Sequence, residues 1–251
     1  MGPRFAEVFT NHLPEGLAAF AALLAVNVSP FDLQRLAVPA AKAGQHELAF
    51  QMLAQLRWQG MGELEFVLAA YQHLKAWRGR AAALEWLRQK VPPPMLNPSS
   101  MMIFAAKEFD LLWDLIEQPE QGSHADYVWL LRAAASAKLG PGKDPHRNAL
   151  LAYFRGRGER HYHVIGRYLL GLVTDSEVLT LATDARKRCE SAYYLGWRAQ
   201  TEGRYEDASD WYRVTIEVGE EKFFEYRWAY QTLYRWEGEG KSLARLAAER
   251  L

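Results

Sequence analysis

Residues 189–220 contain the pattern that most constrains how this chain can fold. Apolar residues recur at helical spacing on both sides of Gly203, which falls in the short turn between the two patterns. Ala208 and Tyr212 follow the turn and are four residues apart, so they lie on one face of the second helix. The segment is therefore predicted to form two helices joined by a tight turn, with a small residue where they cross.

The same pattern occurs again near the N-terminus. Residues 42–53 align without gaps on residues 201–212. In this alignment, matching positions hold the same or a similar residue: Gly44 on Gly203, Glu47 on Glu206, Ala49 on Ala208, Leu53 on Tyr212 and, further on, Gly60 on Gly219. A tight turn favours glycine because the backbone there needs a positive φ. We therefore predict an internal repeat of helix pairs.

A third copy sets the spacing of the repeat. Ala83 and Leu87 lie 34 residues after Ala49 and Leu53. The pattern resembles the tetratricopeptide repeat, in which a Leu-Gly pair, a small residue and an aromatic residue recur over about 34 residues. Four positions of the late copy carry the resemblance: Leu195, Gly196, Ala208 and Tyr212. The copy departs from the repeat at three positions, with Ala192 for tryptophan, Ala199 for tyrosine and no closing proline.

The resemblance implies an all-α fold, an α-α superhelix of roughly five to seven helix pairs. One continuous domain over residues 1–251 is expected. The units that match best are about 30–60, 64–94, 189–220 and 222–251, with an irregular middle over residues 95–188. Gly44 and Gly203 are 159 residues apart, which is not a multiple of 34, so the middle must contain non-standard units. No stretch shows the sustained alternation of a β-strand.

Local signals place further helix boundaries. Ser29-Pro30 is typical of a helix start, and Thr174 with Glu177 has the spacing of a capping box. Additional helices are expected at residues 4–10, 17–27, 64–91 as a pair, 127–139, 161–173, 177–183, 223–236 and 241–251. A weaker helical face is expected between Phe109 and Ile116.

The composition of the chain limits which partners and which cellular location are expected. The chain carries 30 basic and 30 acidic residues, and a net charge of zero disfavours nucleic acid as a partner. Cys189 is the one cysteine, so it forms no internal disulfide and is predicted to be buried. The most apolar stretch, residues 17–28, is shorter than the roughly 20 residues of a membrane span. A cytoplasmic protein without a membrane segment is expected.

The resemblance also implies a binding surface. In this architecture, the first helix of each pair lines a concave face that holds a partner protein or peptide. Candidate partner contacts on that face are Gln34, Arg35 and Val38, then Leu68, Ala69, Gln72 and Lys75, and finally Tyr193, Tyr194, Trp197 and Gln200. The paired Lys and Asn with which some such repeats hold a terminal carboxylate are not found. Alternatively, the three late aromatic residues pack against the neighbouring helix pair.

A basic segment provides an alternative function. Residues 155–167 contain Arg155, Arg157, Arg160 and Arg167, opposed only by Glu159. Arginine forks pair with phosphate or carboxylate, so this segment is a candidate anion contact in a nucleic-acid-binding or regulatory module. The alternative is a solvated turn at the start of a helix.

No pattern of catalysis or metal binding is found in the sequence. His161 and His163 are two residues apart, so on a helix they point in different directions and cannot share an ion. Phosphate-binding, dinucleotide-binding and nucleophile-elbow motifs are absent. We therefore expect no enzyme and no cofactor, but a scaffold or adaptor that binds another protein within a multi-subunit complex.

Overall fold

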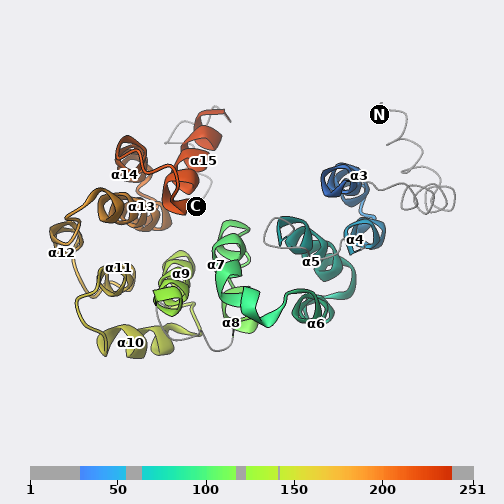
Figure 1. Ribbon diagram of the computed structural model, residues 1–251, viewed down its shortest axis with the longest axis horizontal. Coiled ribbons are helices and arrows are strands. Elements are labelled where there is room, and N and C mark those ends of the chain that lie inside the picture. The colour runs from blue at the N-terminus through green and yellow to red at the C-terminus, as the bar shows by residue number, and fades with distance from the viewer. Residues whose placement is uncertain (1–28, 55–63, 117–122, 141, 239–251) are drawn as a thin grey trace. The chain divides into compact units, whose positions relative to one another are not determined.

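The computed structural model describes residues 29–54, 64–116, 123–140 and 142–238 (Figure 1). Every regular element in these ranges is a helix, which confirms the predicted all-α class for that part of the chain. The helices predicted at residues 4–10, 17–27 and 241–251 lie outside the described residues.

The chain divides into two compact units. Unit 1 comprises residues 1–106 and 114–116, and unit 2 comprises residues 107–113 and 117–251. The expected single domain over residues 1–251 stays a prediction.

Unit 1 is a succession of short helices. Its elements are α3 (Pro30–Lys42), α4 (His46–Ala54), α5 (Leu64–Arg78), α6 (Arg80–Lys90), the 3₁₀ helix η2 (Pro93–Met95) and α7 (Leu96–Ala105). The predicted start of α3 is confirmed, because the Ser29 hydroxyl caps the helix by accepting from the Asp32 backbone N–H, and Pro30 occupies the first helical position.

Consecutive helices of unit 1 pack against each other, α3 on α4, α4 on α5 and α5 on α6. The predicted turn glycine Gly44 has a φ of +77° between α3 and α4. Beyond this turn, Ala49 is fully buried where the helices cross, as the repeat predicts. The core beneath these helices is formed by Leu33, Ala37, Ala40, Leu48, Ala49, Met52, Leu53 and Ala70.

Unit 2 contains the longest described helix, α13, with 18 residues, and also helices as short as the six residues of α12. Its helices are α9 (Ser123–Leu139), α10 (Arg147–Arg155), α11 (His161–Leu169), α12 (Asp175–Thr180), α13 (Ala185–Glu202), α14 (Tyr205–Glu217) and α15 (Phe224–Gly238). Helix α8 (Leu111–Asp114), whose first three residues belong to unit 2, is far shorter than the face predicted over residues 109–116.

The pair α13–α14 has the predicted geometry. Gly203 ends α13 with a φ of +85°, and Ala208 is fully buried where α14 crosses α13. A Cβ atom on Gly196 would lie only 2.8 Å from the ring of Tyr212, so the two helices meet where the side chain is a hydrogen atom. The matching positions of the repeat are therefore the contact points of the helix pair.

Two predicted helices need correction at their ends. Helix α11 ends at Leu169 instead of residue 173, because Gly171 adopts a φ of +78° directly after it. Helix α12 covers Asp175–Thr180 instead of residues 177–183, since the Thr174–Glu177 capping box places its start at residue 175. The capping box itself is confirmed.

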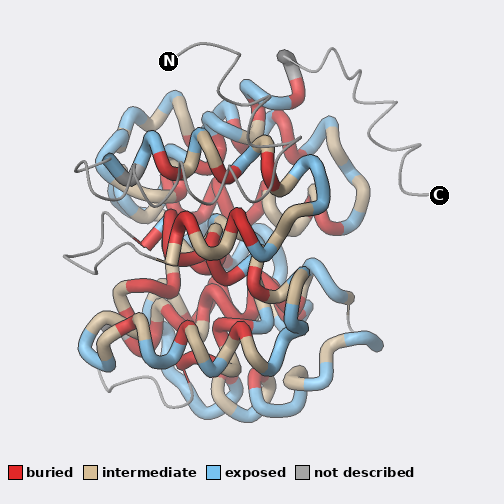
Figure 2. Tube along the Cα trace, turned by 90° about the vertical axis from the view of Figure 1, so that its right-hand side faces the viewer, coloured by how far each residue is buried: buried red, intermediate tan, exposed pale blue. Residues whose placement is uncertain are grey.

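Helix α9 packs against α10, α11 and α13. Every residue from 130 to 136 is buried, and Figure 2 shows buried residues along the helix sides that face other helices. A helix that is buried all round needs no polar face, which explains the Ala-rich sequence of α9.

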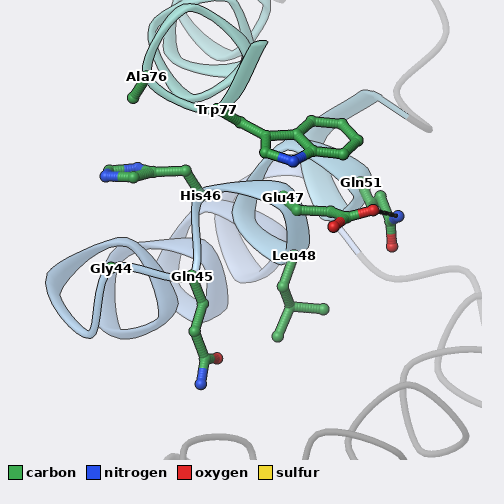
Figure 3. Close-up of a pocket in the computed structure, with 8 residues that line it drawn as sticks. All are labelled: Gly44, Gln45, His46, Glu47, Leu48, Gln51, Ala76 and Trp77. Atoms are coloured by element: carbon green, nitrogen blue, oxygen red, sulfur yellow. Dashed lines mark hydrogen bonds between the residues drawn. The ribbon is translucent and has the colours of Figure 1, made fainter.

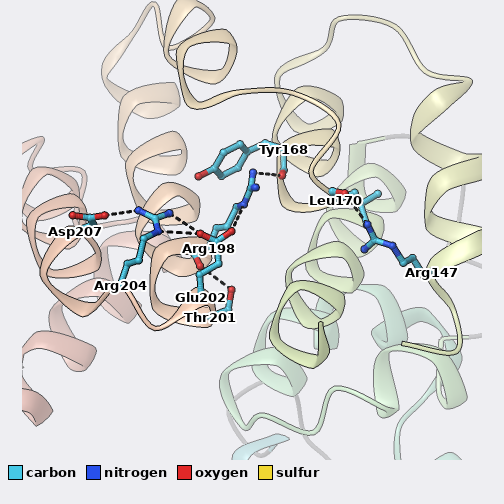
Figure 4. Close-up of polar contacts among 8 residues, drawn as sticks. All are labelled: Arg147, Tyr168, Leu170, Arg198, Thr201, Glu202, Arg204 and Asp207. Carbon is cyan, nitrogen blue, oxygen red and sulfur yellow. Dashed lines mark hydrogen bonds and ion pairs between the residues drawn. The ribbon is translucent and has the colours of Figure 1, made fainter. Parts of the chain in front are cut away.

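Polar contacts connect α13 with the neighbouring helices α11 and α14 (Figure 4). Arg198 of α13 donates to the backbone oxygen of Tyr168 at 2.8 Å and to the Glu202 carboxylate at 2.8 Å. Arg204 pairs with Glu202 and with Asp207 across the turn between α13 and α14. These contacts tie α13 to the end of α11 and to the start of α14.

Candidate functional site

Three buried carboxylates lie in the N-terminal halves of helices in unit 2. Asp126 and Glu225 belong to the first turns of α9 and α15, and Glu190 lies in the second turn of α13. Buried carboxylates must be hydrogen-bonded or paired, and each of these is. We name this group, with its tyrosine and histidine neighbours, the carboxylate network.

Glu225 is the carboxylate of the network with a strongly raised pKa. It is 2% exposed, and its Oε1 accepts from the hydroxyl of Tyr127 at 2.7 Å and from that of Tyr194 at 3.3 Å. Burial, reinforced by the charge of Glu190, raises the pKa of Glu225 to about 7, although the tyrosine hydrogen bonds oppose this shift. Glu225 therefore exchanges a proton near neutral pH.

Glu190 of α13 contacts two residues of α11. The Tyr162 hydroxyl donates to its Oε1 at 2.9 Å, and His161 Nε2 lies 3.2 Å from its Oε2. Arg186, one turn earlier on α13, is 3.8 Å away. Because the ring of Tyr162 also contacts the ring of Tyr127, the Glu190 and Glu225 groups are neighbours.

Asp126 connects α9 with α10 and α11. Its Oδ1 accepts from the Tyr153 hydroxyl at 2.6 Å and lies 3.0 Å from His163 Nε2. Burial acts to raise the pKa of Asp126, but the contacts with Tyr153 and His163 outweigh it, so the pKa lies below its usual value. His161 and His163 thus face different carboxylates, as their spacing predicts. Over the described ranges, no three His, Cys, Asp or Glu side chains form a group able to hold a metal ion.

Cys189 lies beside this network and is fully buried, as predicted. Burial raises the pKa of its thiol to about 12, with the charges of Glu225 and Glu190 contributing further. A thiol with so high a pKa is not a nucleophile at neutral pH.

The late candidates for partner contact all lie on α13. Their side chains make contacts within unit 2. Tyr193 and Tyr194 are buried, and Tyr193 packs against Tyr212 and Trp228. For these two rings, the structure therefore agrees with the alternative given above, in which they pack against the neighbouring helices instead of contacting a partner. Trp197 donates to the backbone oxygen of Ala134 at 2.8 Å. Gln200 likewise has an internal partner, since it accepts from the hydroxyl of Tyr212 at 2.6 Å.

The early candidates, on α3 and α5 of unit 1, are more accessible. Arg35, Val38 and Gln72 are exposed, whereas Gln34, Ala69 and Lys75 are half-buried and Leu68 is buried. Sequence reasoning missed Phe31, which is 67% exposed although its ring contacts Phe66 of α5 at 5.1 Å. The sequence could have indicated Phe31 through its position, because it precedes Arg35 by four residues and Val38 by seven and so shares their face of α3.

A pocket of about 470 Å³ opens between the start of α4 and the end of α5 (Figure 3). Its walls include His46, Trp77 and a hydrogen-bonded pair in which Gln51 donates to Glu47 at 3.1 Å. The ring of His46 stacks on His73, and burial, together with His46, lowers the pKa of His73. No motif marked this pocket in the sequence, since its residues come from two helices.

Three arginines of the basic segment, residues 155–167, make contacts within the segment or with neighbouring residues of unit 2. Arg167 donates to the backbone oxygens of Arg157 and Gly158 and pairs with Glu159 at 2.8 Å. The guanidinium of Arg157 lies 4.4 Å from the ring centre of Tyr153. Arg160 is mostly exposed and lies 3.6 Å from Asp126, and Arg155 is exposed on α10. The four arginines therefore do not converge on one anion site.

Comparison of the chain with protein-family models, with curated proteins and with solved structures returned no match. Within the described ranges, none of the helices has both the length and the apolar character needed to cross a membrane.

Proposed function

We propose that this chain is a non-catalytic interaction scaffold built from tetratricopeptide-like helix pairs, which binds another protein or peptide through exposed helix faces. The architecture is supported by the matching contact points of two pairs. Gly44 and Gly203 both turn the chain with a positive φ, and Ala49 and Ala208 are both fully buried five residues later. A superhelical stack of such pairs is the arrangement that this register favours.

The exposed face of α3 is the observation that carries the binding function. Phe31 and Val38 are 67% and 45% exposed, and Arg35 lies between them on the same face. Two large apolar side chains and an arginine on one face are typical of a protein interface, where apolar and arginine contacts contribute most of the affinity. The face includes two residues, Arg35 and Val38, that the sequence placed on the binding surface.

The proposed function is tested by capturing partners from the native lysate with the tagged chain at low and at high salt. A variant carrying Phe31→Ser and Val38→Ser is compared with wild type and with a control carrying Leu179→Ser and Val214→Ser, two exposed apolar residues of unit 2. We expect wild type and control to retain one stoichiometric protein at high salt and the α3 variant to lose it.

Equal capture by the α3 variant would contradict a role for this face. Recovery of nucleic acid alone, released by salt and lost on substitution of Arg155 and Arg160 by alanine, would instead favour the alternative function of the basic segment.

A further inference from the structure

The outward face of α15 combines exposed aromatic rings with arginines. Arg227, Tyr230, Tyr234 and Arg235 recur at helical spacing, and all four are exposed. The rings of Tyr230 and Tyr234 are 52% and 69% exposed and lie nearly parallel, with centres 6.3 Å apart and 11° between their planes. Adjacent tyrosines left in solvent beside arginines have the composition of a binding surface.

A further cation, Lys107, interacts electrostatically with Arg235 of this face. Its φ of +61° is in the left-handed region, and no other non-glycine residue in the described ranges has a positive φ. Such a backbone is unfavourable for lysine and is found most often at functional sites. Burial lowers the pKa of Lys107, and the positive charge of Arg235 lowers it further. The two like charges of Lys107 and Arg235 therefore repel each other.

These two cations contrast with other arginines of unit 2. Arg198, Arg204 and Arg213 each pair with a carboxylate on their own helix or across the adjoining turn. Over the ranges that the structure describes, neither Lys107 nor Arg235 forms an ion pair. Two like charges that form no ion pair in the described ranges would be stabilised by an external anion through charge-assisted hydrogen bonds.

The surrounding charges favour a peptide over a nucleic acid. Glu108 and Asp110 closely follow Lys107 in the sequence, and the whole chain has no net charge. A continuous phosphate backbone would meet these carboxylates and gain no long-range attraction. A peptide, in contrast, can place single carboxylates on the cations while its apolar side chains pack against the tyrosines.

We propose that the α15 face, defined by Lys107, Arg227, Tyr230, Tyr234 and Arg235, docks an acidic segment of a partner protein. The docking site presupposes the scaffold function and gives the chemistry of one partner.

The test is a titration of the full chain into a fluorescein-labelled peptide rich in Asp and Glu with one aromatic residue, followed by fluorescence anisotropy. The same peptide with Asn and Gln in place of the acids, and a labelled single-stranded oligonucleotide, are titrated in parallel. The variants are Lys107→Gln, Arg235→Gln and, as a matched control, Arg213→Gln on the exposed face of α14. Circular dichroism verifies that each variant keeps the helical content and melting temperature of wild type.

We expect the acidic peptide to bind wild type and Arg213→Gln equally, and the amide peptide not to bind. Either Lys107→Gln or Arg235→Gln should weaken binding roughly tenfold, because each removes one charge-assisted hydrogen bond. Failure of wild type to bind, equal binding by the two variants, or tighter binding of the oligonucleotide would overturn the docking site. Each of these results leaves the capture experiment on α3 unaffected, so the scaffold function is judged separately.

Discussion

At the scale of single residues, the space around Gly196 is the tightest constraint on α13. A methyl group there would lie 2.8 Å from two ring carbons of Tyr212 and 3.2 Å from the backbone oxygen of Ala208. Tyr212 is fully buried and its hydroxyl is bonded to Gln200, so the ring has no space to move into. The hydrogen side chain of Gly196 therefore sets how closely α13 and α14 approach.

The substitution Gly196→Ala should lower the stability of the protein. Alanine in a helix is normally about 1 kcal/mol more favourable than glycine, but overpacking at this contact should cost about 1–3 kcal/mol. Thermal unfolding followed by circular dichroism measures the balance. The matched control is Gly142→Ala, where an added Cβ meets nothing within 4 Å. A higher melting temperature for Gly196→Ala would show that the contact is loose.

Glu225 should make stability depend on pH. Its pKa is 4.5 when unfolded and about 7 in the folded protein, so folding takes up a proton between these values. Stability from this group is greatest below about pH 4.5 and falls by up to about 1.4 kcal/mol per pH unit as the pH rises towards 7. The melting temperature should be higher near about pH 5.5 than near about pH 8.

The variant Glu225→Gln isolates this effect. Glutamine has nearly the shape of the protonated acid and still accepts from Tyr127, but it carries no charge beside Glu190. Its melting temperature should change less with pH than that of wild type, while the exposed control Glu217→Gln should follow wild type. If Glu225→Gln and wild type keep the same pH profile, the carboxyl of Glu225 does not titrate in this range.

At the scale of elements, Arg132 explains how the four-residue helix α8 is held against α9. Its guanidinium donates twice to the backbone oxygen of Leu112, at 3.0 and 2.9 Å. It lies 4.1 Å from the ring centre of Trp113 and 4.7 Å from that of Trp129. Burial lowers the pKa of Arg132 to about 10, which leaves it charged at neutral pH. A planar cation between two indoles links both helices.

Replacing Arg132 by lysine should therefore destabilise the protein although the charge is kept. An ammonium group cannot donate in the same fork or stack on both rings, so we expect a loss of about 2–3 kcal/mol in the free energy of unfolding. Urea unfolding measures this loss, and near-ultraviolet circular dichroism reports on the two tryptophans. Arg213→Lys on exposed α14 should be neutral, and a neutral Arg132→Lys would mean that α8 is held by its apolar contacts alone.

Local chemistry made the helix pairs predictable. The turn at Gly203, the start at Ser29-Pro30 and the capping box at Thr174 each depend on a few consecutive residues, and all are confirmed. The length of α8 was not predictable, because its partner Arg132 lies 20 residues further along the chain. Element ends that depend on distant contacts leave no local signal.

At the scale of the whole molecule, stability should be distributed unevenly within unit 2. Residues 130–136 of α9 and 189–196 of α13 are all buried, whereas α12 buries only Val178. Hydrogen exchange measured by mass spectrometry should therefore be slowest in α9 and the middle of α13 and much faster in α12. Equal protection of α12 and α9 would show that unit 2 opens only as a whole.

The candidate site was less predictable than the fold because it depends on contacts far apart in sequence. Tyr127 and Glu225 are separated by 98 residues, and nothing near either residue indicates the other. The resemblance implies that Tyr193 lies on an exposed groove, yet Trp228 of α15 and Tyr212 of α14 pack against its ring. Tyr230, Tyr234 and Lys107 were missed, since exposure and an unusual φ become visible only in three dimensions.

The carboxylate network has a consequence for how this sequence can diverge. Each acid depends on a tyrosine of another helix: Tyr153 for Asp126, Tyr162 for Glu190 and Tyr127 for Glu225. Loss of one hydroxyl would leave a buried acid short of a donor, and loss of the acid would leave a half-buried phenol without that acceptor. Replacing only the tyrosine or only the acid of a pair is therefore unfavourable, whichever is replaced first. Among natural variants of this chain, we expect each tyrosine and its acid to be replaced together or not at all.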